Sequence, residues 1–282
     1  MSAELPIGEN AYLRNHLPDE LPAIRDMSSD FDYLLEGFGN NKYRSGLALE
    51  YVNHLKARFQ PGEYSVGDPE YAREQILPRL FLDTMTFTAS REIYQTSARG
   101  RGGESTLPVL QGLINAKIDL QKDISEYVFL NPNKDNLVLY HSLVLIMNHS
   151  RRVLYGDMVT DERAKQSNLS QLSGILAEYK VLSTLLEDWP QATFGSASQD
   201  MAEADIVVPA RRNPELGVVL QVKADRNPLC KMKLFVKGRR VPTLVVPMDT
   251  SQHDPLKLSG EHSEMVKNYV SAVPRLELAP AT

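Results

Sequence analysis

The chain is poor in residues that mark several classes of protein. It has one cysteine and one tryptophan in 282 residues, and aromatic residues make up 7% of it. The lone cysteine, Cys230, excludes an intramolecular disulfide framework and is typical of a reducing compartment. Basic residues are not in excess either, since the formal net charge is -5. This charge argues against a protein that coats nucleic acid with its whole surface, although it allows a local basic groove.

Long apolar runs are also missing. The most apolar stretch, 137–147, is interrupted by His141 and Ser142, and it is far shorter than the roughly 20 residues of a membrane-spanning helix. The N-terminal residues do not contain a basic segment followed by an apolar one, so we expect no signal peptide. We therefore expect a cytoplasmic protein without membrane contact.

Three common catalytic motifs are absent from the sequence. No glycine-rich loop leads into Lys-Ser or Lys-Thr, so nucleotide hydrolysis is not indicated. No histidine and cysteine cluster has the spacing of zinc ligands, and His141 and His149 are two helical turns apart. The Gly-x-Ser-x-Gly turn of serine hydrolases is missing as well.

Helical patterns dominate the first half of the chain. Apolar residues at three- and four-residue steps predict helices between 31 and 59, from Asp68 onward, over 107–129 and over 135–155. We expect Pro78 to kink or split the second of these stretches. The polar residues 156–168 are the best candidate boundary, so we predict a helical domain over 1–160 that contributes DNA recognition or dimerisation.

An arginine- and glycine-rich stretch, 97–103, is expected to interrupt the helices of this domain. Its glycines allow close approach of the backbone, and Arg99 and Arg101 suit contact with phosphate groups. A flexible, solvated connection is the alternative interpretation.

The second half combines one amphipathic helix with short β-branched runs. Glu178 lies one helical turn from both Ile175 and Leu182, which places it at the edge of a buried stripe. Asp205 enters the apolar run 204–209, a polar turn follows, and the run 217–223 contains Gln221 and Lys223. Two such runs joined by a short polar connection predict a β-hairpin. In an extended strand Gln221 and Lys223 project from one face.

These side chains suit phosphodiester hydrolysis. The oxygens of Asp205 and Gln221 are hard ligands of the kind that Mg²⁺ prefers. Lys223 could position the attacking water or stabilise the transition state, and Glu178 could support the metal site from the helix. The alternative is that Glu178, Asp205 and Lys223 are solvated polar residues on an ordinary α/β core.

The motif Gly174-x-x-x-Glu178, followed by Ala204-Asp205-Ile206-Val207-Val208 and Leu220-Gln221-Val222-Lys223-Ala224, resembles the restriction-endonuclease-like PD-(D/E)xK nuclease superfamily. The glutamine in place of the second acid is similar to the active site of Mrr-type restriction nucleases. The resemblance implies an α+β or α/β domain over 165–282, with αβββαβ order and a central mixed sheet. It also implies Mg²⁺, or Mn²⁺ instead, held by Asp205 and Gln221 with Glu178 in support, and a catalytic Lys223.

Basic residues flank this motif. A helix is predicted from Asn227-Pro228 toward Gly238, and together with the turn before the second run it supplies a set of candidate DNA contacts: Arg211, Arg212, Lys231, Lys233, Lys237, Arg239 and Arg240. A solvated charged face is the alternative interpretation of the same residues.

The sequence therefore predicts a metal-dependent endodeoxyribonuclease, of the restriction or defence type. A single-site enzyme that cuts both strands would act as a homodimer. Two alternatives remain open: a repair, recombination or transposition nuclease acting on structured DNA, and a non-catalytic nucleic-acid-binding module on a nuclease fold.

Overall fold

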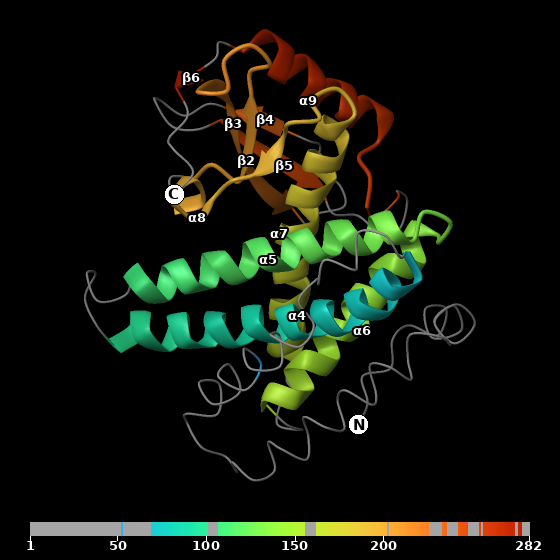
Figure 1. Ribbon diagram of the computed structural model, residues 1–282. Coiled ribbons are helices and arrows are strands. Elements are labelled where there is room, and N and C mark those ends of the chain that lie inside the picture. The colour runs from blue at the N-terminus through green and yellow to red at the C-terminus, as the bar shows by residue number, and fades with distance from the viewer. Residues whose placement is uncertain are drawn as a thin grey trace. The chain divides into compact units, whose positions relative to one another are not determined.

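The computed structural model describes residues 52, 69–100, 107–155, 162–201, 203–225, 233–235, 242–247, 254, 256–273 and 276–277. The chain divides into two compact units, residues 1–169 and 170–282. The division falls inside helix α7 (Glu162–Leu186), which already begins within the polar stretch that the sequence indicated as a boundary. The architecture is α+β, with helices first and a mixed sheet after them (Figure 1).

The first unit contains α4 (Pro69–Gly100), α5 (Leu107–Leu130) and α6 (Asn136–Tyr155). Helix α4 packs against both α5 and α6. The fully buried side chains of α4 and α5 are large and apolar, and include Phe81, Leu82, Met85, Leu120, Ile124 and Tyr127. Burial of one such side chain contributes about 1.5–3 kcal/mol, so this core explains why the helices are long.

The helices predicted over 107–129 and 135–155 are confirmed as α5 and α6. The prediction for α4 is wrong at residues 97–100, where the helix continues into the expected arginine- and glycine-rich interruption. Of the two outcomes expected at Pro78, a split does not occur, since the helix continues through this residue. Proline removes one backbone hydrogen bond. The fully buried neighbours Ile76 and Leu80 hold both sides of that position in the core, and such packing overrides local preference.

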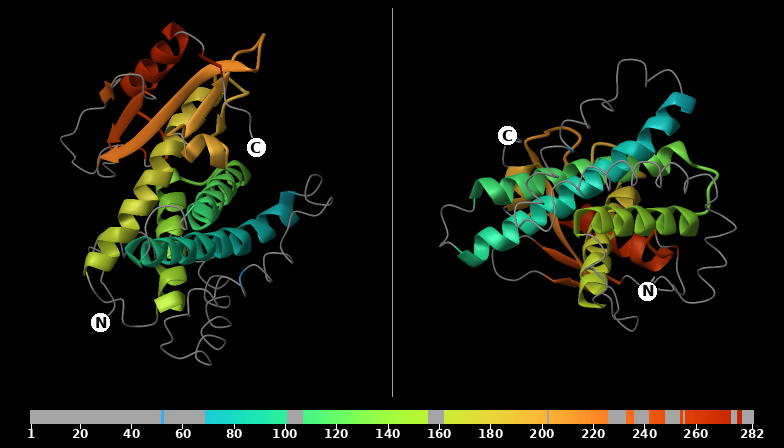
Figure 2. Two further views of the ribbon diagram at one scale, coloured as in Figure 1. Left: turned by 90° about the vertical axis from the view of Figure 1, so that its left-hand side faces the viewer. Right: turned by 90° about the horizontal axis from the view of Figure 1, so that it is seen from below.

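The second unit is built around strand β3 (Leu216–Asp225). The main path of its six-stranded sheet runs β1-β2-β3-β5-β4, with β6 paired to the start of β3 (Figure 2). The partner strands are β1 (Thr193–Phe194), β2 (Ile206–Pro209), β4 (Lys233–Phe235), β5 (Thr243–Pro247) and β6 (Leu276–Glu277). Strands β3 and β5 are parallel, and the other pairs are antiparallel.

The predicted hairpin is confirmed as β2 and β3, with Ile206 opposite Leu220 and Pro209 opposite Gly217. Its connection closes on Asn213, whose side-chain oxygen accepts a hydrogen bond from the Glu215 amide over 3.1 Å. Asparagine favours such turns because its side chain can replace a backbone acceptor. The closed turn fixes the register of every later residue on β3.

The helix predicted over 227–238 is wrong at residues 233–235, which form β4 and pair with β5. An apolar run this short is compatible with either a helix or a strand. Here it forms a strand because it can pair with the edge of β5. The expected αβββαβ order places a helix between β3 and β5. In the described part of that connection the structure has the strand β4 instead. Residues 276–277 form β6. Helix α9 (Gly260–Ala272) lies between β5 and β6 in the sequence.

Candidate functional site

Asp205 lies where the chain leaves a tight turn and enters β2. Glu203 holds a left-handed conformation with φ 67°, and α8 (Ala197–Met201) precedes it. The Gly195 amide donates to the Asp205 carbonyl over 2.9 Å. A Cβ atom at Gly195 would lie 2.0 Å from the Ala204 carbonyl oxygen, so only glycine fits beside this turn. The backbone around Asp205 is thus positioned by a close approach that sequence reasoning missed.

The Asp205 carboxylate ends the ladder between β2 and β3. Its Oδ2 accepts a 2.7 Å hydrogen bond from the amide of Val222, and Asp205 exposes 6% of its surface. The neighbouring Gln221 amide donates to Pro242 on the β5 side over 2.9 Å. Successive amides of a strand point to opposite edges, so the Val222 amide faces the edge where β2 has already stopped. The carboxylate satisfies this amide in place of a strand partner.

Gln221 lies beside Asp205 by register. Because Ile206 is opposite Leu220, Asp205 is one step further along and opposite Gln221, and opposed residues of an antiparallel pair project from the same face. The Thr243 hydroxyl donates to Gln221 Oε1 over 2.9 Å, and these two residues are also partners in the parallel pair of β3 and β5. The amide oxygen of Gln221 is therefore held in one orientation by the next strand.

Lys223 is exposed two residues further along β3, on the same face as Gln221. The residues between and before them, Val218, Leu220 and Val222, are buried on the other face. The register of the hairpin thus brings an acid, an amide oxygen and an ammonium group to neighbouring positions, and Gln221 and Lys223 share one face of β3.

Glu178 comes from a separate element, the second half of α7. It exposes 7% of its surface, which confirms that it lies away from solvent. The surrounding helix is buried more completely than the predicted stripe, because Lys180 is also inside, at 2% exposure. Burial lowers the pKa of Lys180 to about 8, and the charge of Asp254 opposes this shift. No sequence signal indicated the burial of Lys180, because a lysine on a helix is usually solvated.

The two hairpin arginines lie away from these residues. Arg211 and Arg212 are exposed in the connection beyond Pro209, at the opposite end of the hairpin. From Gly217, which pairs with Pro209, to Lys223 the strand rises about 20 Å at 3.3 Å per residue. Their closeness to the motif in the sequence is therefore not closeness in space.

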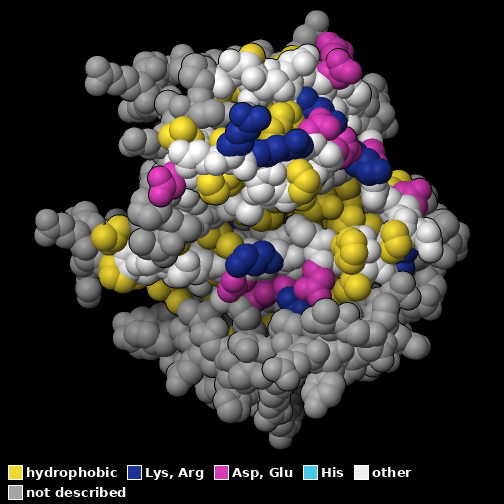
Figure 3. Space-filling view, turned by 45° about the horizontal axis from the view of Figure 1, so that its top comes forward, with side chains coloured by type: hydrophobic (Ala, Val, Ile, Leu, Met, Phe, Trp, Pro, Cys, Tyr) yellow, Lys and Arg dark blue, Asp and Glu magenta, His cyan; other side chains and the backbone are white. Residues whose placement is uncertain are grey.

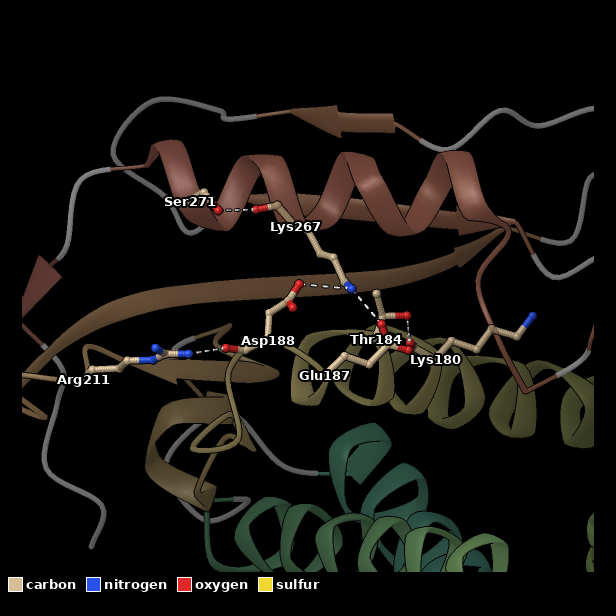
Figure 4. Close-up of polar contacts among 7 residues, drawn as sticks. All are labelled: Lys180, Thr184, Glu187, Asp188, Arg211, Lys267 and Ser271. Carbon is tan, nitrogen blue, oxygen red and sulfur yellow. Dashed lines mark hydrogen bonds and ion pairs between the residues drawn. The ribbon is translucent and has the colours of Figure 1, made fainter. Parts of the chain in front are cut away.

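Arg211 instead belongs to a surface pocket of about 580 Å³ at the end of α7. Its guanidinium donates to the Asp188 carbonyl over 2.9 Å (Figure 4). Lys267 on α9 forms ion pairs with Glu187 at 2.6 Å and Asp188 at 3.0 Å. Hydrogen bonds to these two carboxylates raise the pKa of Lys267. Such exposed pairs contribute little stability, but they connect α9 to the end of α7.

Of the remaining candidate DNA contacts, only Arg99 and Lys233 are among the described residues. Arg99 lies in the last turns of α4 and Lys233 in β4. Arg101, Lys231, Lys237, Arg239 and Arg240 lie outside the described residues. On the face seen in Figure 3, the described lysines and arginines are interspersed with acidic side chains rather than gathered in one basic surface.

Among the described residues, no group of three or more histidine, cysteine or acidic side chains is arranged to hold a metal ion. A site built on Asp205 and Gln221 would therefore have few protein ligands. Within the described stretches, no helix combines the length and apolar character needed to cross a membrane.

No known protein family, curated protein or solved structure matches the chain significantly. The resemblance to nucleases consequently rests on the motif and on the hairpin that carries it.

Proposed function

We propose that the chain is a Mg²⁺-dependent endodeoxyribonuclease of the restriction or defence type, with its active site on the β2–β3 hairpin. The observation that supports this most directly is the register that aligns Asp205 with Gln221 and places Lys223 on the same face. The order Asp, Gln and Lys is that of the D…QxK variant of the PD-(D/E)xK motif, in which glutamine replaces the second acid. The choice of DNA as the substrate comes from the resemblance alone.

The oxygens of this hairpin fit a hydrated Mg²⁺ ion. Asp205 Oδ2 accepts a hydrogen bond from Val222, and Gln221 Oε1 accepts one from Thr243. Carboxylate and amide oxygens are acceptors with two lone pairs each. Mg²⁺ is commonly held by one or two carboxylates together with waters and substrate phosphates. A site with a single carboxylate and one amide oxygen is within that range.

Each protein residue would then have a separate role. Bound Mg²⁺ would lower the pKa of a water and neutralise charge that develops on the phosphate. Lys223 would orient the attacking water or stabilise the negative charge of the transition state. Thr243 would keep the Gln221 oxygen turned toward the site, as partners of metal ligands commonly do. Glu178 would orient water from α7.

The test is cleavage of supercoiled plasmid by the full chain, with and without Mg²⁺. Cleavage that requires the metal and is lost in Lys223→Ala would support the proposal. Lys257→Ala is the matched control, because Lys257 is an exposed lysine of the same unit outside the hairpin. Cleavage that persists in Lys223→Ala would contradict the proposed site. Branched DNA and RNA, tested in parallel, separate a structure-directed nuclease from a sequence-directed one.

One observation favours a second candidate, a binding module without catalysis. The bond from Val222 gives the buried Asp205 a structural role that requires no metal. This candidate predicts nucleic-acid binding that is unchanged by Mg²⁺ and by Lys223→Ala. Binding measured by fluorescence anisotropy, with and without a chelator, distinguishes it from the nuclease.

A further inference from the structure

The surface pocket at the end of α7 is formed by three parts of the second unit. The residues after α7 contribute two acids and Trp189, the hairpin connection contributes Arg211, and α9 contributes Glu264 and Lys267. The pocket has a volume of about 580 Å³, within the range of sites that hold small molecules. It lies at the opposite end of the hairpin from Lys223, so it is separate from the proposed active site.

Three charged side chains of this pocket bind one another. The ammonium group of Lys267 lies 2.6 Å from Glu187 Oε2 and 3.0 Å from Asp188 Oδ2 (Figure 4). An ammonium group has three N–H donors and no acceptor, so two carboxylates occupy most of its capacity. These three side chains are therefore engaged with one another rather than available to a ligand.

The lining has two further charged groups, Arg211 and Glu264, and neither forms an ion pair with any residue that the structure describes. Arg211 donates to the Asp188 carbonyl over 2.9 Å, which holds its side chain in place. A guanidinium has five N–H groups, so most of its donors stay available. Glu264 is exposed on α9, whereas Arg211 belongs to the hairpin connection. The pocket thus presents a cation and an anion from two separate elements.

Apolar surface accompanies these two groups. Trp189 is half-buried, and Pro190 next to it also lines the pocket. An indole ring packs well against hydrocarbon, and its face attracts an ammonium group. A ligand that fits this pocket therefore combines two opposite charges with an apolar body.

We propose that the pocket binds a small zwitterion with an apolar body, the chemistry of a free apolar amino acid or of a short apolar peptide. Arg211 binds the carboxylate, to which a guanidinium can donate two parallel hydrogen bonds. Glu264 binds the ammonium group, and Trp189 packs against the apolar body. The lining has three acidic and two basic side chains, and this net charge of -1 disfavours a simple anion. A simple cation would leave the donors of Arg211 unused.

The fluorescence of Trp189, the single tryptophan, reports on ligand binding directly. The full chain is titrated with leucine, phenylalanine and the dipeptide of each, and with the same amino acids blocked as amides or as N-acetyl derivatives. We expect a saturable change of emission with a zwitterion, and binding of both blocked forms that is weaker by about tenfold or more. The affinities for amino acids and for dipeptides, compared with each other, identify which of these two sources the pocket fits.

Two results would overturn the proposal without any variant. One is that no zwitterion gives a saturable change in emission, or in the heat of binding, below about 10 mM. The other is that the blocked forms bind as tightly as the zwitterions. Because the measurement is binding, it does not depend on whether the chain cleaves DNA.

Two substitutions test which side chain binds which charge. Arg211→Gln should weaken binding of the zwitterion by about tenfold or more and remove its advantage over the amide, which lacks the carboxylate. Glu264→Gln should instead remove the advantage over the N-acetyl form, which lacks the ammonium group. Arg212→Gln and Glu261→Gln are the matched controls, because these exposed neighbours do not line the pocket. Affinities in Arg211→Gln and Glu264→Gln equal to those of the controls would refute the proposed site.

Discussion

The amide of Val222 donates a 2.7 Å hydrogen bond to the carboxylate of Asp205, at the point where β2 stops pairing with β3. The same carboxylate is the leading candidate for a metal ligand. Asp205 would therefore serve both as the end of a strand ladder and as part of the site. Because Val222 is flanked by Gln221 and Lys223, the bond also connects the acid to the strand segment that carries the other two groups.

Substitutions of Asp205 separate these two roles. Asp205→Ala removes the acceptor of a buried amide, and we expect it to lower the free energy of unfolding by about 1–3 kcal/mol. Asp205→Asn keeps an oxygen for the Val222 amide and should cost less than about 1 kcal/mol, yet abolish metal-dependent cleavage. Urea unfolding followed by the fluorescence of Trp189, the single tryptophan, reports on this unit. Cleavage at the normal rate by Asp205→Asn would exclude this residue as a charged ligand.

Gly195 is expected to tolerate no side chain. In Gly195→Ala the new Cβ would lie 2.0 Å from the Ala204 carbonyl oxygen, so the turn before Asp205 must shift. We expect a loss of about 1–3 kcal/mol in the free energy of unfolding, together with loss of cleavage. Gly174→Ala is the control, because nothing lies within 4 Å of its added Cβ on α7. It should stabilise the chain by about 0.5–1 kcal/mol; equal effects of both variants would contradict the steric explanation.

Lys180 is expected to destabilise the chain at neutral pH. Its pKa is about 8 in the folded state, against 10.5 ordinarily. The unfolded state therefore holds the proton more tightly, and the free energy of unfolding should rise with pH from about 8 to about 10.5. Lys180→Met should remove this rise and raise stability at pH 7 by about 1–3 kcal/mol. Trp189 fluorescence in urea measures both effects, and Lys257→Met at an exposed position should change neither.

Thr243 is expected to act through Gln221. Thr243→Val keeps the shape of the side chain but removes the hydroxyl that donates to Gln221 Oε1. If Gln221 is a metal ligand, we expect the Mg²⁺ concentration for half-maximal cleavage to rise about 10–100-fold. Thr243→Ser keeps the hydroxyl, so its half-maximal Mg²⁺ concentration should equal that of the unaltered chain. An unchanged Mg²⁺ requirement in Thr243→Val would show that the Thr243 hydroxyl does not orient Gln221 for metal binding.

Local patterns predicted much of the fold. The spacing of apolar residues located α5 and α6 within a residue or two, and the buried segment of α7 around Ile175 and Leu176. Two β-branched runs joined by a short polar turn predicted the hairpin of β2 and β3, and with it the common face of Gln221 and Lys223. These features depend on residues that are close in the sequence, so a periodic pattern is enough to define them.

Contacts between distant segments decided the remainder. Residues 233–235 became a strand because the edge of β5 was available, and α4 continued through Pro78 because its neighbours are buried. Three contacts join separate elements: the bond from the Val222 amide to Asp205, the bond from the Thr243 hydroxyl to Gln221, and the ion pair of Arg79 with Asp123. No periodicity encodes such pairs, because each depends on which backbone or side chain the completed fold brings opposite. The sequence by itself thus determined which chemical groups the chain carries. Tertiary packing determined which of these groups are in contact and which are removed from water.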